Sequence, residues 1–254
     1  MAVRRLALLL EYEGTRYSGF QYQKNAPSVQ REVESAIQRL TGEQVRIAGA
    51  GRTDAGVHAA GQVVAFTTEA PYECRSFASA LNHFLPEDIA VRQAREVPLG
   101  FDPRRHARSR VYRYTVLNRE GRSALWRRFA HTVYGLLDAE AMRVALAMLE
   151  GQRDFAPFAG PLGGRRSTVR RLYRTAVWRE GEVVRLEVEG NAFLPQQVRR
   201  MAAAVLRVGT RQMSMEEFGA LANGGRHGAC QWMLPPAGLC LVSVNYPGLF
   251  FEET

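Results

Sequence analysis

One short glycine-rich stretch carries the residue types that could do chemistry. It reads Gly49-Ala50-Gly51-Arg52-Thr53-Asp54-Ala55-Gly56-Val57-His58 and lies between the strand-like runs 45–47 and 62–68, so it is predicted to be a loop joining two strands. Its glycines allow a left-handed backbone or a close approach to a ligand. Loops held by a sheet often carry functional side chains, although an Asp in such a turn also commonly binds nearby backbone.

Three kinds of chemistry are open to Asp54. A dinucleotide-binding fingerprint is disfavoured, because Asp54 stands where the third glycine belongs and a strand is predicted to follow. A metal site would use Asp54 and His58, but no further ligand is suitably spaced nearby. The third is a carboxylate nucleophile, which Arg52 or Arg199 would keep ionised. Such a group can attack an electron-poor sugar carbon, and because only one carboxylate is evident, plain glycoside hydrolysis is disfavoured.

The elements that must position this loop fall into two similar sets. In the first, strands are predicted at 5–12, 45–47, 62–68 and 89–91, with helices that begin near Ser28 and Phe77. This order of strand, helix, strand, strand, helix, strand is ferredoxin-like. After the irregular stretch 99–107 the order repeats loosely, with strands at 111–117, 172–178, 183–189 and 239–242 and helices that begin near Asp138, Pro195 and Ser214.

The predicted fold class is therefore α+β, with two ferredoxin-like (RRM-like) halves whose largely antiparallel sheets are flanked by helices. Residues 1–104 form the N-terminal half, which carries the Asp54 loop. Residues 105–254 form the C-terminal half, which carries Tyr112 and Arg199.

The charge indicates a polyanionic partner. The 254 residues carry a formal net charge of +9, and arginines that meet phosphates also release condensed counterions. Arginines gather with tyrosines in two stretches, 104–114 and 165–174, a combination that suits single-stranded or looped RNA. A solvated strand face would explain either stretch alone.

The cysteines and the apolar runs bear on the cellular compartment. Cys74, Cys230 and Cys240 form no C-x-x-C pair, so neither a disulfide framework nor a zinc site is expected. Residues 6–10 predict a first strand rather than a secretion signal, because Glu11 interrupts the run. No run approaches membrane-spanning length, and a cytoplasmic protein without membrane contact is predicted.

The nine residues Gly51-Arg52-Thr53-Asp54-Ala55-Gly56-Val57-His58-Ala59 resemble the signature of the tRNA pseudouridine synthase A (TruA) family. Further similar blocks follow in family order over nearly the full chain, among them Tyr12-Glu13-Gly14-Thr15-Arg16-Tyr17-Ser18-Gly19-Phe20-Gln21, Tyr112-Arg113-Tyr114, Asn191-Ala192-Phe193-Leu194 and Val198-Arg199. In one of its departures from the family, this chain has Leu194-Pro195-Gln196-Gln197 where His and Met are common. Different packing around Arg199 is therefore expected.

The resemblance implies an isomerase that converts uridine to pseudouridine in the anticodon stem-loop of tRNA, at positions 38, 39 and 40, without cofactor or metal. Asp54 would be the nucleophile and Arg199 would pair with it. Tyr112 would pack on the target base, and Arg52 would help to hold the flipped nucleotide. The active-site cleft would lie between the two halves, and a homodimer would bind tRNA across both subunits.

Two questions stay open at the level of sequence. Asp54 could attack the sugar C1′, act through a glycal after removal of the 2′ proton, or add to C6 of the base. The alternative function is a non-catalytic RRM-like RNA-binding module or tRNA chaperone, with Asp54 as a turn residue and Tyr112 in the core. The absence of RNP-type motifs disfavours that alternative. His58 is expected to order the loop rather than act as an acid or base.

Overall fold

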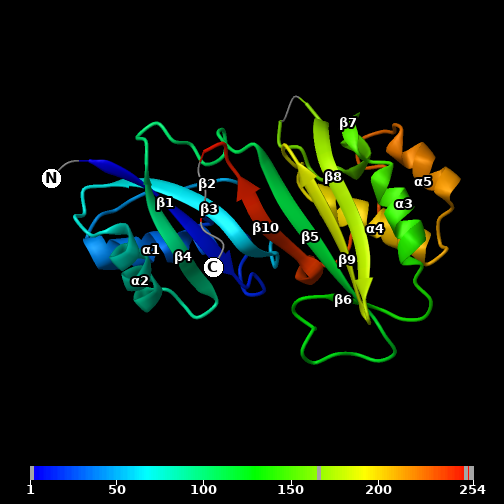
Figure 1. Ribbon diagram of the computed structural model, residues 1–254, viewed down its shortest axis with the longest axis horizontal. Coiled ribbons are helices and arrows are strands. Elements are labelled where there is room, and N and C mark those ends of the chain that lie inside the picture. The colour runs from blue at the N-terminus through cyan, green and yellow to red at the C-terminus, as the bar shows by residue number, and fades with distance from the viewer. Residues whose placement is uncertain (1–2, 165–166, 249–250, 252–254) are drawn as a thin grey trace. The chain divides into compact units, whose positions relative to one another are not determined.

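The computed structural model describes residues 3–164, 167–248 and 251, and the chain forms two compact units (Figure 1). Unit 1 comprises residues 1–108 and 241–254, and unit 2 comprises residues 109–240. The boundary expected from sequence lies after residue 104 and keeps 105–254 together, whereas the structure assigns the C-terminal residues to unit 1. Arg165 and Arg166 of the second arginine-rich stretch lie outside the described residues.

Unit 1 is a sheet that carries two helices on one face. Its elements, in chain order, are β1 (Arg4–Tyr12), α1 (Val29–Thr41), β2 (Ala48–Gly49), β3 (His58–Thr68), α2 (Cys74–Phe84) and β4 (Ile89–Val97). β1 pairs antiparallel with both β3 and β4, and β10 (Leu239–Asn245) is the next strand beside β3. α1 and α2 contact each other (Figure 1), and the ring of Phe77 in α2 lies 5.9 Å from that of Phe66 in β3.

The local sequence explains most of these elements. The spacing of Val29, Val33 and Ile37 predicts a helix with one apolar face, and all three side chains are buried in α1. Gly42 ends this helix with φ 77° and donates its N–H to the carbonyl oxygen of Gln38.

The strand predicted at 45–47 is wrong. Only Ala48 and Gly49 pair with β3, because the backbone N–H of Ile47 donates to the Glu34 carboxylate at 3.0 Å instead of to a neighbouring strand. On its N-terminal side, the loop that carries Asp54 is tied to β3 through the paired residues Ala48 and Gly49 and through the N–H of Ala50, which donates to the Val63 carbonyl oxygen at 2.8 Å.

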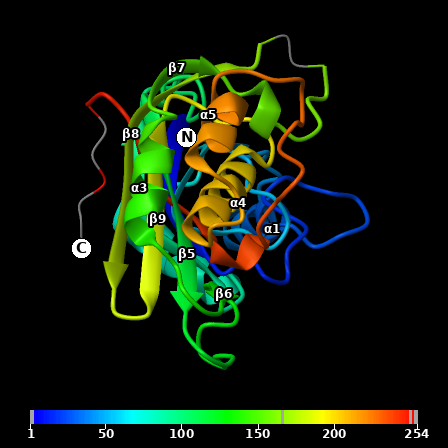
Figure 2. The ribbon, with the colours of Figure 1, turned by 90° about the vertical axis from the view of Figure 1, so that its right-hand side faces the viewer.

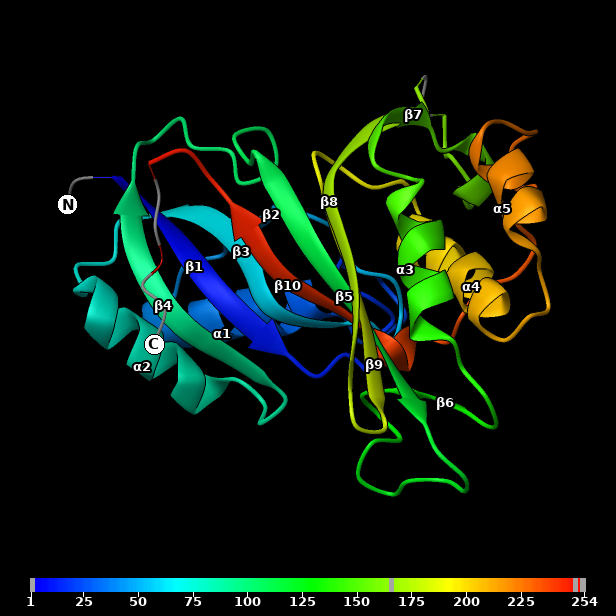
Figure 3. The ribbon, with the colours of Figure 1, turned by 45° about the vertical axis from the view of Figure 1, so that its right-hand side comes forward.

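Unit 2 is also built on mainly antiparallel strands, with helices on one side. Its elements are β5 (Ser109–Asn118), β6 (His131–Val133), α3 (Ala139–Ala147), β7 (Gly151–Asp154), the 3₁₀ turn η1 (Ala156–Phe158), β8 (Val169–Glu180), β9 (Val183–Gly190), α4 (Gln197–Gly209), α5 (Met215–Ala222) and the 3₁₀ turn η2 (Pro236–Gly238). The strands run β5-β9-β8-β7 with antiparallel pairing (Figure 3). β6 adds to β5 in parallel, and the three helices contact one another (Figure 2). Neither β6 nor β7 is predicted from sequence.

The two faces of the unit 2 sheet differ in chemistry. Tyr112, Tyr114 and Val116 are opposite Val188, Leu186 and Val184, and all six side chains are buried. On the other face the Glu187 carboxylate accepts from the Arg113 guanidinium at 2.7 Å and from the Arg174 guanidinium at 3.0 Å. Both arginines belong to the stretches proposed to meet RNA, and the structure gives each of them an intramolecular partner.

The helix ends of unit 2 follow their sequence signals with one exception. Asp138 caps α3 by accepting from the N–H of Ala141 at 2.9 Å, and Ser214 forms the predicted capping box with Glu217. Pro195, however, precedes the N-cap residue of α4 rather than lying in its first turn.

The α+β class and the antiparallel sheets flanked by helices are confirmed. Within the described part of the chain, no helix has the length and apolar character needed to cross a membrane.

Candidate active site

Asp54 lies in the loop that joins β2 to β3, and its side chain is half-buried. The N–H of Val57 donates to the Asp54 carbonyl oxygen at 3.1 Å and closes a turn, which Gly56 completes with φ 76°. Arg52, two residues earlier, is exposed. The turn therefore places a carboxylate and a guanidinium on one short, bent segment.

Three neighbouring segments hold this loop through hydrogen bonds. The hydroxyls of Tyr12 and Thr53 lie 2.8 Å apart, and both side chains are buried. The Thr53 carbonyl oxygen accepts from the N–H of Phe20 at 3.1 Å. The Gln62 side-chain amide, fully buried in β3, donates to the Gly51 carbonyl oxygen at 2.9 Å. Because buried polar groups are costly to leave unpaired, the backbone on either side of Asp54 has little freedom to move.

His58 connects the Asp54 loop to the segment after β1. Its Nδ1 accepts from the N–H of Gly14 at 3.0 Å, which requires that nitrogen to be unprotonated. At the same place a Cβ added to Gly14 would lie 2.0 Å from the Val57 carbonyl oxygen, so no other residue fits without moving backbone. This geometry suits the expected loop-ordering role of His58.

The family-like block that begins at Tyr12 is largely scaffold for the loop. The Tyr17 hydroxyl donates to the Asp88 carboxylate at 2.6 Å, and Arg16 pairs with the same carboxylate. Burial and the bond to Asp88 raise the pKa of the Tyr17 hydroxyl. The Tyr17 carbonyl oxygen accepts from the N–H of Gly56 at 3.1 Å, so this ordered pair supports the Asp54 turn directly.

Tyr112 lies in β5 on the helix-covered face of the unit 2 sheet. Its side chain is only 8% exposed, and its ring meets that of Phe193 edge to face at 5.1 Å. Such an arrangement holds the phenol ring in one orientation.

Arg199 lies in α4 and is also buried, with 9% of its surface exposed. Its Nε donates to the carbonyl oxygen of Leu234 at 2.8 Å, which orients the guanidinium. The Arg199 charge also acts on Tyr114. Burial raises the pKa of the Tyr114 hydroxyl, and Arg199 opposes that shift. A Cβ added to Gly238 would lie 2.6 Å from the Tyr114 ring, so this glycine allows the ring to pack.

The departure at Leu194-Pro195-Gln196-Gln197 forms the entry to α4. Gln196, the N-cap residue, has φ 61°, a left-handed conformation that few non-glycine residues adopt. Gln197 is fully buried, and its side-chain oxygen accepts from the N–H of Leu194 at 2.8 Å. The two glutamines therefore form the turn at which α4 begins, and this turn sets the position of Arg199 in the helix.

Sequence reasoning found Asp54, Arg52, Tyr112 and Arg199 but missed the residues that position them. Arg52 and Asp54 share one loop in unit 1, and Tyr112 and Arg199 belong to unit 2. No positioning role was predicted for Tyr12, Tyr17, Gln62 or Tyr114. Tyr12 and Tyr17 stand in a family-like block, and Tyr114 lies two residues from Tyr112 on the same strand face, whereas Gln62 had no such signal. Among the described residues, no group of three or more His, Cys, Asp or Glu side chains could hold a metal ion.

A family model described as tRNA pseudouridine synthase matches residues 9–104 and 145–247. The chain belongs to the tRNA pseudouridine synthase family. It is 41% identical to tRNA pseudouridine synthase A of Geotalea uraniireducens, over 96% of this chain and 100% of that protein. It is 44% identical to tRNA pseudouridine synthase A of Myxococcus xanthus, over 95% of this chain and 92% of that protein.

Among solved structures, one titled "Crystal Structure of a Cbf5-Nop10-Gar1 Complex" matches with a TM-score of 0.34 and 11% identity, over 92% of this chain and 57% of that chain. This likeness is too low to carry an argument.

Membership in the tRNA pseudouridine synthase family confirms the family resemblance and the prediction that this chain is an isomerase. It also decides against the non-catalytic RNA-binding module. The matched ranges include Arg52, Asp54 and Arg199, while Tyr112 falls in the interval between them.

Proposed function

We propose that this pseudouridine synthase acts on uridines 38, 39 and 40 of the tRNA anticodon stem-loop, with Asp54 as its nucleophile. The observation that carries the proposal is the loop itself: a half-buried carboxylate on a turn that Tyr12, His58 and Gln62 hold through hydrogen bonds. A nucleophile held in one place removes much of the entropic cost of reaching the reacting atom.

Three further residues are proposed to bind the nucleotide. Among the described residues, the exposed Arg52 guanidinium has no hydrogen-bond or ion-pair partner, which leaves it available for a phosphate. Tyr112 is fixed by Phe193 and offers a ring against which the target base can pack. Arg199, oriented through Leu234, supplies a partly desolvated positive charge that would favour the ionised form of a nearby carboxylate.

The proposed reaction consumes no co-substrate. The bond between uracil N1 and C1′ breaks, the base turns, and a new bond forms between C5 and C1′. The proton on C5 leaves to solvent, and N1 gains a proton. The target base must also leave its stack at a cost of a few kcal/mol, which the contacts from Arg52 and Tyr112 are proposed to offset.

Tritium at uridine C5 provides the test, because its release accompanies product formation. Wild-type protein should release the label from an anticodon stem-loop, and Asp54→Asn should bind the same RNA without releasing it. Asp102→Asn is a matched control from unit 1, since the Asp102 side chain accepts from the backbone N–H groups of Arg104 and Arg105 and pairs with the Arg105 guanidinium at 3.8 Å, contacts that do not involve the Asp54 loop. Equal release by wild type and Asp54→Asn, or no release by wild type, would contradict the proposal.

The three routes open to the Asp54 carboxylate differ at the sugar. A glycal forms only after the 2′ proton is removed, so deuterium at C2′ should slow that route. Attack at C1′ or at C6 breaks no bond to that hydrogen. Single-turnover rates on uridine deuterated at C2′ therefore separate the glycal route from the other two.

We also infer that the chain acts as a homodimer in the cytoplasm. The family resemblance supports the dimer, and tRNA as substrate supports the compartment. All three cysteines, Cys74, Cys230 and Cys240, are free thiols, which suits a reducing environment. Light scattering after size-exclusion chromatography should give twice the chain mass of 28.4 kDa, and a monomer at all concentrations would contradict the dimer.

A further inference from the structure

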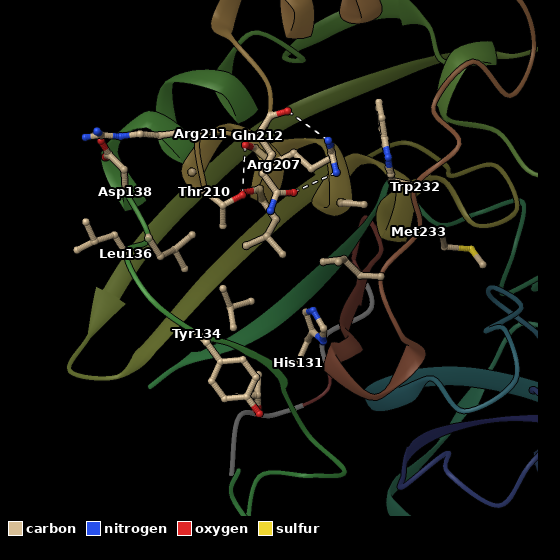
Figure 4. A pocket seen from close by; sticks show the side chains of 17 residues that line it. His131, Tyr134, Leu136, Asp138, Arg207, Thr210, Arg211, Gln212, Trp232 and Met233 are labelled. Atoms are coloured by element: carbon tan, nitrogen blue, oxygen red, sulfur yellow. Dashed lines mark hydrogen bonds between the residues drawn. The ribbon is translucent and has the colours of Figure 1, made fainter. Parts of the chain in front are cut away.

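A cavity of about 950 Å³ opens in unit 2, and none of its lining residues belongs to the Asp54 loop (Figure 4). It is bounded by β6, the segment that follows β6, the C-terminal half of α4 and residues 232–234. Its size is in the range of pockets that bind small molecules, and a nucleotide is of that class.

The ring of Trp232 offers a preorganised stacking surface at this cavity. The Arg207 guanidinium lies 4.4 Å from the centroid of its ring, and that guanidinium is itself held by the Gln212 side-chain oxygen at 3.0 Å and the Gln212 carbonyl oxygen at 3.2 Å. The Trp232 side chain nevertheless stays 40% exposed, and Tyr134, another ring that lines the cavity, is 59% exposed. An exposed ring held in place, such as that of Trp232, suits an unstacked base.

The charge of the lining favours a phosphate over an apolar partner. Arg207 and Arg211 line the cavity together with one carboxylate, Asp138, and that carboxylate accepts from the N–H of Ala141 as the cap of α3. Burial lowers the pKa of His131, so its imidazole adds no charge at neutral pH. The cavity is therefore electropositive.

Arg211 is the lining residue best suited to meet a phosphate. Its φ of 58° is left-handed, a costly conformation for a residue with a side chain and one that persists only where the surroundings enforce it. The side chain is exposed, and within the described part of the chain it has no ion-pair or hydrogen-bond partner.

The cavity continues the helix face that presents Arg199. Ala203 and Arg207, four and eight residues further along α4, both line it, and at 1.5 Å per residue they lie about 6 and 12 Å from Arg199 along the axis. Leu234, whose carbonyl oxygen orients Arg199, lines it as well. A nucleotide one or two places from the one at Arg199 would reach this cavity.

We propose that the cavity binds an unpaired nucleotide adjacent to the target uridine, with its base stacked on Trp232 and its phosphate paired with Arg211. This inference rests on the proposed function, because it takes the anticodon stem-loop as the substrate. The target uridine and its neighbour would then be bound separately, which makes recognition depend on loop nucleotides beyond the one that reacts.

Stem-loops that each lack one base next to the target test the occupant. Affinities are measured in an Asp54→Asn background, so that no RNA is converted. Trp232→Ala should weaken binding of the intact stem-loop by about 5- to 150-fold, the range for one base stacked on an aromatic ring. With one of the abasic RNAs the same substitution should have no further effect, because its stacking partner is already gone.

Trp178→Ala is the matched control. Trp178 also stacks with an arginine, Arg113 at 5.4 Å, but does not line the cavity, so its loss should leave the affinity unchanged. Trp232→Phe should keep most of the affinity, since a ring remains. Arg211→Ala should lower the slope of log affinity against log salt by about 0.7. Arg143→Ala, which removes an exposed arginine paired with Glu140, should not.

Each contrary result has a distinct meaning. If Trp232→Ala and Arg211→Ala bind every RNA as the parent does, the site is overturned. If Trp232→Ala changes the molar mass in solution and leaves RNA affinity intact, the cavity serves a second copy of the chain, and the proposal is again overturned. Trp232→Phe and Arg211→Ala keep the test decisive if Trp232→Ala does not fold. Tritium release by wild type decides the proposed function separately.

Discussion

Asp54 and Arg199 are held in place by two different kinds of structure. Asp54 lies in an irregular loop whose position depends on hydrogen bonds from Tyr12, His58 and Gln62. Arg199 lies in the regular helix α4, whose buried residues include Met201 and neighbours on the same helix. A loop of the first kind depends on a few specific polar contacts, whereas a helix depends on many apolar contacts that can substitute for one another.

The difference teaches that activity and stability should respond differently in the two regions. Changes around the Asp54 loop should move a few backbone atoms and impair catalysis more than they impair folding. Changes in the core of α4 should lower the free energy of unfolding and leave the turnover of folded molecules nearly unaltered. Four substitutions test this comparison, in order of decreasing effect.

The largest effect is expected from Met201→Ala in α4. Met201 is 1% exposed, and truncating a buried methionine costs about 2–5 kcal/mol through lost burial and a cavity. Urea unfolding should show this loss, while kcat stays within a few-fold of wild type under conditions where the variant is folded. Val144→Ala, at a 41% exposed position of α3, should cost less than about 0.5 kcal/mol. A large fall in kcat for folded Met201→Ala would break the comparison.

Gly14→Ala should have the next largest effect, and mainly on catalysis. The added Cβ would meet the Val57 carbonyl oxygen at 2.0 Å, so the backbone that follows Asp54 must shift. A displacement of about 1 Å can cost about 10²-fold in rate, and kcat/KM should fall by that order. Gly100→Ala is the control, because nothing lies within 4 Å of its added Cβ. Wild-type kinetics in Gly14→Ala would show that the loop tolerates movement.

A smaller effect is expected from Tyr12→Phe, which removes the hydroxyl beside Thr53. One lost hydrogen bond should cost about 0.5–1.5 kcal/mol of stability. Because Thr53 precedes Asp54 in the loop, the loss should also displace Asp54 slightly and lower kcat/KM by roughly tenfold or less. Tyr246→Phe removes a comparable hydroxyl, which donates to the Pro103 carbonyl oxygen at 2.6 Å in the same unit. Both variants should lose similar stability, and only Tyr12→Phe should lose activity. Equal activities would mean that this bond serves folding alone.

The smallest effect concerns the pH dependence of unit 2. Burial lowers the pKa of His131 in the folded state, so the unfolded chain binds more protons at acid pH. The stability that this group contributes is therefore complete above its ordinary value of 6.5 and is lost as the pH falls through the lower folded value. Urea unfolding between pH 5 and 7.5 should show this loss, and His131→Gln should reduce it. An unchanged slope in His131→Gln would exclude the histidine as its source.

Local signals predicted the regular elements well and the irregular ones poorly. The apolar spacing of α1, the capping box at Ser214 and the cap at Asp138 are all present, because each depends on residues within one or two turns. The strand predicted at 45–47 is wrong because the distant Glu34 takes the backbone N–H of Ile47. The short strand β6 has no strong pattern of its own and exists because β5 offers it a partner.

The same division applies to the candidate site. The amino-acid sequence alone indicated an RNA-modifying isomerase. It contains the signature around Asp54, the family blocks with Tyr112 and Arg199, and the positive charge. The tertiary structure alone decided that Gln62 holds Gly51, that Gly14 touches Val57 and that Glu187 neutralises Arg113. Each of these contacts joins residues more than ten positions apart in the chain. Local periodicity cannot predict such contacts, because they form only when whole elements pack together. This packing buries polar groups, which then require hydrogen-bond partners.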